Sequence, residues 1–158
     1  MQDGPDDLWS RFAMSVFRLN GLLVLAGDGI TGPLGQSSAR WQVIGRVAFE
    51  AKTVAQLARE IGNARQSVQR VADQLERAGL VTYRAHPVDG RTQLVELTPA
   101  GSQVLEAIYT QQLAWSERIV EQLNSVQLER TVRALDRVSG VLEADLARDQ
   151  TRLSEETS

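Results

Sequence analysis

The chain has 158 residues, of which 42% are hydrophobic, and a formal net charge of −3 at pH 7. This length supports one domain, or one domain with an oligomerisation element. Because the chain contains no cysteine, a disulfide framework and a thiol redox sensor are both excluded. No run approaches the roughly 18 apolar residues of a membrane span, and the acidic start over residues 1–7 lacks the basic segment of a secretory signal. We therefore expect a soluble cytoplasmic protein with no membrane partner.

The first predicted element is a long amphipathic helix near the N-terminus. Its apolar side chains recur at helical spacing, namely at Leu8, Phe12, Val16, Leu19, Leu22, Leu23 and Ala26. We expect this helix to end between Gly27 and Gly29, since glycine is the usual residue just past a helix C-terminus. A second helix is predicted over residues 37–49, where Val43 and Ile44 lie on related faces.

Two short amphipathic helices follow, separated by a turn. The first carries an apolar stripe at helical spacing, formed by Val54, Leu57, Ala58 and Ile61. Thr53 precedes it and Gln56 lies three residues further on, which is the spacing of a capping box. Gly62 and Asn63 break the pattern, and Asn63 with Gln66 repeats the box spacing before the second helix. A turn of about three residues between such helices is typical of a helix-turn-helix.

The second helix of this pair has one apolar face and one polar face. The apolar residues are Val68, Val71, Ala72 and Leu75, and the long polar side chains opposite them are Arg65, Gln66, Gln69, Arg70, Asp73 and Arg77. The polar residues near the start of this helix share the face that a recognition helix inserts into the major groove of DNA. Arg77 has an alternative role, because it can pair with Asp73 four residues earlier.

A β-hairpin is predicted after the second helix. Gly79 occupies the left-handed position that ends a helix, and Leu80 follows as the apolar residue that packs back on it. Residues 80–84 and 92–97 favour strands.

The turn of this hairpin lies within residues 86–91. Pro87 and the Asp89-Gly90 pair are both turn signals. The hairpin thus presents Arg91 at its tip and Arg84 at its base.

Two long helices are predicted after the hairpin. Thr98 with Pro99 is a strong helix start, because the missing N–H of proline costs nothing at the first helical position. The apolar residues of this helix are Leu105, Ile108, Trp115, Ile119 and Leu123, and those of the last helix, after Asn124 and Ser125, are Leu128, Val132, Leu135, Val138, Leu142 and Leu146. Residues 153–158 are expected to form a frayed tail.

Three segments together resemble the winged-helix core of MarR-family transcriptional regulators. They are ARQSVQRVADQLERAGL over residues 64–80, DGR over residues 89–91, and LVELTPAG over residues 94–101. The family also has one long helix before this core and two after it, so the resemblance covers most of the chain. The family usually has two arginines after the wing aspartate, whereas the first of these positions here is Gly90.

The resemblance implies a mainly α fold of the α+β winged-helix type, with a winged helix-turn-helix core and long N- and C-terminal dimerisation helices. The expected segments, all within one structural domain, are residues 1–35 (N-terminal dimerisation helix), 36–98 (DNA-binding core) and 99–158 (C-terminal dimerisation helices). A symmetric homodimer would bury the long apolar stripes of the first and last helices. A helical bundle within one chain is the alternative.

The function implied by the resemblance is a sequence-specific transcriptional regulator, namely a repressor that binds a pseudo-palindromic operator as a homodimer. The residues expected to contact double-stranded DNA are Arg65, Gln66, Ser67, Gln69, Arg70, Arg84, Asp89 and Arg91, with Asp89 orienting an arginine rather than touching DNA itself. Five arginines and three acidic residues over 64–91 give this segment a charge of +2, which leaves −5 for the remainder. Arginine and glutamine side chains can read guanine and adenine edges.

A winged helix can also serve as a protein-interaction module. Such a module should present apolar or aromatic anchors on the exposed face of its second helix. That face here consists of arginine and glutamine, which favours DNA as the partner.

The resemblance further implies that a small aromatic or phenolic effector binds where the dimerisation helices meet the core and releases the repressor from DNA. The candidate pocket residues are Phe17, Arg18, Asn20, Trp41 and Trp115. The alternative is that these aromatic residues belong to the core, because large aromatic side chains are buried mainly for packing.

The composition argues against an enzyme. With no cysteine and a single histidine in a turn, the chain lacks a nucleophile and base pair of the Ser-His or Cys-His type and a clustered metal-ligand spacing. The glycines between Gly27 and Gly35 lack the lysine and flanking strand of a phosphate-binding loop. We expect no catalytic residue, no metal and no cofactor.

Overall fold

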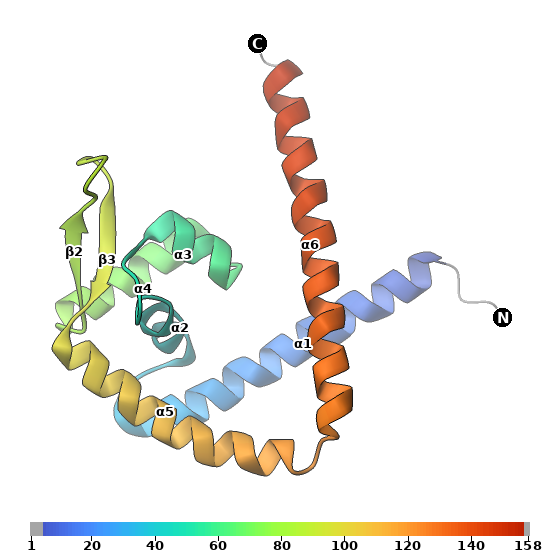
Figure 1. Ribbon diagram of the computed structural model, residues 1–158, viewed down its shortest axis with the longest axis horizontal. Coiled ribbons are helices and arrows are strands. Elements are labelled where there is room, and N and C mark those ends of the chain that lie inside the picture. Colours follow the sequence, from blue (N-terminus) through green and yellow to red (C-terminus); the bar gives the residue numbers. More distant parts are fainter. Residues whose placement is uncertain (1–4, 157–158) are drawn as a thin grey trace. The chain divides into compact units, whose positions relative to one another are not determined.

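The computed structural model describes the backbone of residues 5–156 and the side chains of residues 7–149 and 152. Within that range the elements are α1 (Pro5–Thr31), the 3-10 helix η1 (Gly32–Leu34), α2 (Ser38–Arg46), β1 (Lys52–Thr53), α3 (Val54–Ile61), α4 (Arg65–Arg77), β2 (Val81–Ala85), β3 (Gln93–Leu97), α5 (Pro99–Val120) and α6 (Ser125–Glu156) (Figure 1). Six α-helices and a small three-stranded antiparallel sheet confirm the mainly α winged-helix fold. The chain divides into two compact units, Met1–Ala114 and Trp115–Ser158.

Helix α1 continues through residues 27–29, so the prediction that it ends there is wrong. The glycine at position 27 allows a close approach between two helices instead. A Cβ on Gly27 would lie 2.6 Å from Oγ of Ser38, the first residue of α2. Around this contact the Ser38 N–H donates to Asp28 Oδ1 at 2.7 Å, and Thr31 Oγ1 donates to the Gly27 carbonyl at 2.8 Å. These bonds join the end of α1 to the start of α2.

Helix α1 is also more apolar than expected. The segment Asp7–Leu34 has a mean hydropathy of 1.3 over an 18-residue window, which is long and apolar enough to cross a membrane. This corrects the expectation that no segment approaches a membrane span. Isolated polar residues interrupt the apolar run in the sequence, but they lower its mean hydropathy only slightly. Only 11% of that window is buried within the chain. Length and composition do not distinguish a membrane span from the interface helix of a soluble protein.

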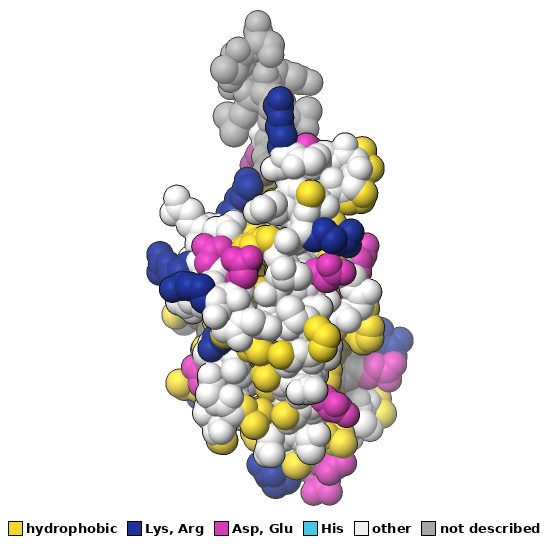
Figure 2. All heavy atoms as spheres, turned by 90° about the vertical axis from the view of Figure 1, so that its left-hand side faces the viewer, with side chains coloured by type: hydrophobic (Ala, Val, Ile, Leu, Met, Phe, Trp, Pro, Cys, Tyr) yellow, Lys and Arg dark blue, Asp and Glu magenta, His cyan; other side chains and the backbone are white. Residues whose placement is uncertain are grey.

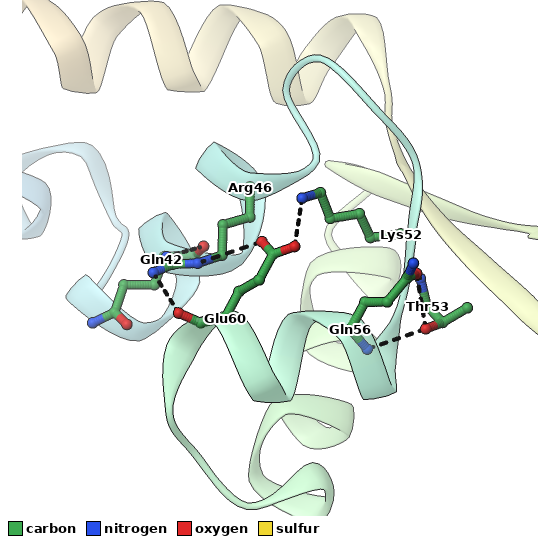
Figure 3. Close-up of polar contacts among 6 residues, drawn as sticks. All are labelled: Gln42, Arg46, Lys52, Thr53, Gln56 and Glu60. Carbon is green, nitrogen blue, oxygen red and sulfur yellow. Dashed lines mark hydrogen bonds and ion pairs between the residues drawn. The ribbon is translucent and has the colours of Figure 1, made fainter. Parts of the chain in front are cut away.

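Helix α3 begins and ends at the predicted positions. Thr53 Oγ1 accepts the Gln56 N–H at 3.1 Å, and Gln56 Oε1 accepts the Thr53 N–H at 2.8 Å, so the capping box is formed (Figure 3). At the other end Gly62 is left-handed, with φ of 73°. The Asn63 N–H then donates to the Ala58 carbonyl at 3.1 Å, which is the closing bond of a Schellman motif.

The predicted capping box at the start of α4 is not formed. Its N-cap is Ala64, and no side chain caps the helix. Asn63 does not serve as the cap because it lies one residue too early and its backbone N–H completes the end of α3. The first backbone N–H groups of α4 therefore lack a side-chain acceptor, and they give this end of the helix a partial positive charge.

The end of α4 is fastened to the start of α5. Gly79 is left-handed with φ of 72°, as predicted, and the Leu80 N–H donates to the Leu75 carbonyl at 3.0 Å. Thr98 caps α5 by accepting the Gly101 N–H on Oγ1 at 3.0 Å. The same hydroxyl donates to the Gly79 carbonyl at 2.7 Å, and the Thr98 N–H donates to the Leu80 carbonyl at 3.1 Å.

The sheet has the strand order β1-β3-β2, and both pairs are antiparallel. Val81 on β2 faces Leu97 on β3, and Ala85 faces Gln93. The first strand is therefore displaced by one residue from its prediction, whereas the second begins one residue later than predicted and ends at the predicted residue. The short strand β1 was not predicted. Two residues give no periodic signal, and β1 exists only because it pairs with β3.

The hydrophobic core of the first unit joins the helix-turn-helix, the hairpin and α5. Its completely or almost completely buried side chains are Val43 and Ile44 of α2, Leu57 of α3, Leu75 of α4, Val81 of β2, Val95 of β3 and Ile108 of α5. This core fixes α4 and the base of the hairpin in one rigid structure. The β2–β3 hairpin projects from one side of the helices (Figure 1).

Helix α6, in the second unit, begins where predicted. Asn124 Oδ1 accepts the N–H groups of Val126 at 3.0 Å and Gln127 at 3.2 Å. The helix extends to Glu156, so the predicted frayed tail over residues 153–158 is helical as far as that residue, and residues 157–158 lie outside the described part of the chain. Apolar side chains at Val132, Val141, Leu142 and Leu146 are exposed along it.

Candidate nucleic-acid interface

Helix α4 presents a polar face opposite its buried stripe. Val68, Ala72 and Leu75 are buried, and Val71 is half-buried. The predicted contact residues Arg65, Gln66, Ser67 and Arg70 are all exposed on the other side. Within the part of the chain whose side chains are described, neither of these two arginines forms an ion pair with a carboxylate. Their guanidinium groups are therefore available to an external anion or base edge.

Gln69 differs from its neighbours on α4, because its side chain is engaged inside the protein. Its amide Nε2 donates to Asp73 Oδ1 at 2.8 Å and to the Tyr83 hydroxyl at 2.7 Å. The Tyr83 hydroxyl donates to the same Asp73 oxygen at 2.7 Å. The hydrogen bond from Tyr83, and to a smaller extent the one from Gln69, hold the pKa of Asp73 below its ordinary value. Burial, and after it the neighbouring Asp73, raise the pKa of Tyr83.

Arg77 interacts with Asp73 of the same helix, which is the alternative role that the sequence left open. Its Nε donates to the Asp73 main-chain carbonyl at 3.2 Å, one turn earlier in the same helix. Its positive charge also contributes to the lowered pKa of Asp73, after the two hydrogen bonds.

Arg84, at the base of the hairpin, is paired across the sheet. Its Nε lies 3.0 Å from Glu96 Oε2, and both side chains are about half exposed. In this arrangement Arg84 offers little net charge, since the carboxylate lies beside it. An exposed pair of this kind contributes little to stability.

Asp89 organises the turn of the hairpin. Oδ2 of Asp89 accepts the Thr92 hydroxyl at 2.6 Å, and Oδ1 accepts the Arg91 backbone N–H at 3.1 Å. Both bonds lower the pKa of Asp89, and the bond from Thr92 has the larger effect. Asp89 thus binds the main chain of Arg91 and not its guanidinium group. The Arg91 side chain is exposed at the tip and pairs with no carboxylate among the described residues.

His86 supports the same turn. Its Nδ1 accepts the backbone N–H groups of Val88 and Asp89, each at 3.2 Å. The side chain of Val88 is 90% exposed at the tip. The tip therefore combines one exposed apolar side chain with the exposed guanidinium of Arg91.

A polar cluster that the sequence did not reveal fastens α3 to its surroundings (Figure 3). Lys52 Nζ lies 2.6 Å from Glu60 Oε1, and Arg46 Nε lies 4.0 Å from Glu60 Oε2. Arg46 also donates to the main-chain carbonyls of Gln42 at 3.0 Å and Glu60 at 3.1 Å. These partners are up to 14 residues apart, so no short-range spacing in the sequence could have indicated them.

The surface charge is mixed. On the face shown in Figure 2, arginine and lysine side chains stand beside acidic ones, and apolar patches lie among them. Because charges beyond about 8 Å are screened at physiological salt, the local set at α4 and the hairpin tip governs contact with an anion more than the net charge of −3 does.

The predicted effector residues are not gathered around a described cavity. Phe17, Arg18 and Asn20 lie on the exposed surface of α1, with Phe17 70% exposed. Trp41 is half-buried on α2, and Trp115 is half-buried on α5 where the second unit begins. A cavity of about 210 Å³ within the first unit lies between α1, α2, α3 and α4, with Val24, Val43, Ser67 and Val71 among its lining residues. The five predicted residues do not line this cavity.

Comparisons with known proteins assign this arrangement to one family. A profile of the MarR family matches residues 29–92, from the end of α1 to the hairpin. An uncharacterized protein of Mycobacterium tuberculosis is 35% identical over 136 residues, which cover 86% of this chain and 95% of that protein. The chain belongs to the MarR family.

Solved structures of MarR-type regulators share the fold. The MarR/EmrR family transcriptional regulator from Acinetobacter sp. ADP1 is 18% identical with a TM-score of 0.75, over 85% of this chain and 96% of that one. CouR from Rhodococcus jostii, solved with p-coumaroyl-CoA, is 20% identical with a TM-score of 0.70, over 78% and 88% of the two chains. A MepR variant of S. aureus, solved with an oligodeoxyribonucleotide, is 19% identical with a TM-score of 0.54, over 82% and 97%. These likenesses show that the chain has the fold of MarR-family transcription regulators.

Proposed function

We propose that this MarR-family protein is a cytoplasmic repressor that binds a pseudo-palindromic operator as a homodimer and dissociates from it when a small effector binds. The main observation behind the proposal is that three arginines, Arg65 and Arg70 on α4 and Arg91 at the hairpin tip, are exposed. None of them forms an ion pair with a carboxylate among the described residues. A helix and a wing that are held in one rigid core can engage two adjacent grooves of a duplex at once.

The start of α4 supports insertion into the major groove. Arg65, Gln66 and Arg70 lie on one exposed face within its first turns. Arginine can donate two hydrogen bonds to guanine, and glutamine can pair with adenine through its donor and acceptor. The uncapped N–H groups at this end add partial positive charge beside the phosphates. Ser67 adds a short hydroxyl on the same face.

The hairpin tip supports a contact in the neighbouring minor groove. Arg91 is held in place through its backbone N–H, which donates to Asp89, while its side chain stays exposed. Narrow minor grooves concentrate negative potential and attract inserted arginines. The Gly90 position, which is usually arginine in the family, leaves Arg91 as the cation of this tip.

The apolar surface of α1 supports the homodimer. Leu22 and Leu23 are each 53% exposed, and Leu25 is 68% exposed. A soluble chain does not leave an apolar helix face of this length in water, because burying it is strongly favourable. Gly21, one residue before Leu22 on the same helix, has no atom within 4 Å of the position of a Cβ. A glycine in an exposed helix costs roughly 1 kcal/mol relative to alanine, and a closely packed helix of a second copy would account for it.

Release by an effector is proposed on the chemistry of residues in the middle of α1 and on α2. Arg18 and Asn20 offer polar anchors, while Phe17 and Trp41 offer aromatic surfaces. A small aromatic or phenolic carboxylate fits this combination, since its ring can stack and its anion can pair with arginine. Trp115 stays a proposed contact on α5.

The experiment that tests the proposed function is selection of bound fragments from genomic DNA by the purified full-length protein at about 150 mM salt, where weak non-specific binding is suppressed. The Arg70→Ala, Arg91→Ala double variant is selected in parallel. We expect the wild-type protein to enrich a palindromic sequence that the double variant fails to enrich. Lack of enrichment by the folded wild-type protein would contradict DNA reading and favour an interaction module that binds a partner protein.

A further inference from the structure

The contact between the recognition helix and the hairpin is more specific than a hydrophobic one. Gln69, Asp73 and Tyr83 form a closed triangle of hydrogen bonds whose three sides measure 2.7, 2.7 and 2.8 Å. Two of its members belong to α4, one turn apart, and the third belongs to β2. The triangle therefore links the recognition helix directly to the hairpin.

Alternation along β2 explains why Tyr83 can reach α4. Val81 is buried and Tyr83 is half-buried, whereas Thr82 and Arg84 between and beyond them are exposed. Val81 and Tyr83 thus share the face of the strand that packs on the helices. Tyr83 is also paired in register with Val95, a fully buried residue of β3, so its position moves with the hairpin as a whole.

The triangle uses all the donors of the Gln69 side chain. One N–H of its amide is bonded to Asp73 and the other to Tyr83. Reading adenine requires that the amide of glutamine both donate to N7 and accept from N6. To do so, Gln69 would have to give up at least one internal bond and turn its amide away from the triangle, which would deprive Asp73 or Tyr83 of a hydrogen-bond partner in a half-buried position. Among the residues whose side chains are described, neither Gln66 nor Arg70 has a hydrogen-bond partner of this kind, so both can contact bases without this penalty.

We infer that Tyr83 is a positioning residue, which fixes the hairpin relative to the recognition helix through its bonds to Gln69 and Asp73. Gln69, Asp73 and Tyr83 together form this fixture, and Gln69 therefore does not read bases. The inference rests on the proposed DNA-reading function. The fixture acts by preorganisation: when α4 lies in one groove, Arg91 is already aimed at the next, so binding does not have to order the hairpin. This inference gives Gln69 a role different from the DNA contact expected from the sequence, and the variants below distinguish the two roles.

A double-mutant cycle on operator binding tests this inference. Tyr83→Phe keeps the ring and removes only the hydroxyl that bonds to Gln69 and Asp73. We expect it to weaken operator affinity about tenfold, and to change affinity less than about twofold when Arg91→Ala has already removed the hairpin contact. Tyr109→Phe, the same change at the other tyrosine, is the matched control and should leave affinity unchanged. Thermal unfolding of each variant verifies that it is folded.

The base preference of Gln69→Ala provides a second readout. As part of the fixture, Gln69→Ala should weaken binding while leaving the preferred operator sequence the same. Asp73→Asn, which keeps an acceptor oxygen for Tyr83, should bind closer to the wild-type protein than Asp73→Ala does. A purely structural role for the triangle would lower the melting temperature without producing the non-additive coupling to Arg91.

The outcomes separate this inference from the proposed function. If the wild-type protein binds no operator, the proposed function fails and the inference fails with it. If the wild-type protein binds but Tyr83→Phe binds equally well, or its loss is fully additive with that of Arg91→Ala, only the inference is overturned. Relaxed preference at a single base position in Gln69→Ala would likewise overturn it, because Gln69 would then be a reader.

Discussion

Gly101 approaches the backbone of Leu80 so closely that a Cβ on Gly101 would lie 2.0 Å from the Leu80 carbonyl oxygen. This contact brings the start of α5 against the end of α4, where Thr98 also bonds to the Gly79 and Leu80 carbonyls. The recognition helix and the helix that leads out of the core are therefore coupled through main-chain atoms, which side-chain changes cannot easily relax.

Replacement of this glycine should destabilise the protein. We expect Gly101→Ala to lower the free energy of unfolding by about 1–3 kcal/mol or more, because the new methyl group must displace a main-chain carbonyl in a packed region. Chemical denaturation measures the change. Gly29→Ala is the matched control, since a Cβ there meets no atom within 4 Å. Equal stability of Gly101→Ala and the wild-type protein would show that the junction is looser than described.

Stability should depend on alkaline pH through Tyr83. Burial, and then its hydrogen bond to Asp73, raise the pKa of Tyr83 above its ordinary value near 10. The unfolded chain loses this proton at a lower pH than the folded chain does. The stabilisation from Tyr83 is thus fully present below about pH 10 and is lost as the pH rises above it. Unfolding measured between pH 8 and pH 11 should show a smaller decline in Tyr83→Phe than in the wild-type protein, and identical slopes would contradict the assignment.

The ion pair at the base of the hairpin should weaken DNA binding. Glu96 lies 3.0 Å from Arg84 and cancels its charge. We expect Glu96→Gln to strengthen operator binding several-fold and to steepen its salt dependence, because the freed guanidinium can neutralise a phosphate. Stability should change by less than about 1 kcal/mol, as both side chains are half exposed. Glu129→Gln, which breaks a similar pair on α6, is the control, and equal effects of the two variants would refute a local role.

Association should depend on the exposed leucines of the outer helices. Leu22 on α1 and Leu142 on α6 are 53% and 42% exposed in the single chain. We expect sedimentation equilibrium to give twice the mass of one chain for the wild-type protein, and Leu22→Glu or Leu142→Glu to shift it toward the monomer, because a buried unpaired carboxylate is costly. Glu143→Gln, beside Leu142, should leave the mass unchanged. A monomeric wild-type protein would contradict the dimer.

Much of the fold follows from local signals in the sequence. The capping box of Thr53 and Gln56, the left-handed Gly79 and the Thr98 cap are short-range patterns with a defined hydrogen-bond geometry, and each is formed. The errors arose where a residue type has two uses. Gly27 was expected to end a helix but allows a close helix contact, and Asn63 was expected to begin α4 but completes the end of α3.

The candidate interface was harder to predict in detail. The amphipathic pattern of α4 predicts which side chains face outward, but it does not reveal which of them are engaged inside the protein. Gln69 and Tyr83 are 14 residues apart, and Arg84 and Glu96 are 12 apart, so their bonds depend on the packing of the hairpin. For the same reason the sequence could not show that Arg84 pairs with a carboxylate whereas Arg65, Arg70 and Arg91 do not pair with one among the described residues.

The decisive measurement for DNA reading is the affinity of the purified protein for its selected operator, titrated over a range of salt concentrations. We expect steep salt dependence for the wild-type protein, and a loss of binding free energy of at least about 2 kcal/mol with a smaller slope for the Arg70→Ala, Arg91→Ala variant. The Arg133→Ala, Arg148→Ala variant removes the same charge from α6, where both arginines are paired with acidic residues, and it should bind almost as the wild-type protein does. Equal binding by the wild-type protein and the Arg70, Arg91 variant would contradict the claim that α4 and the hairpin tip read DNA.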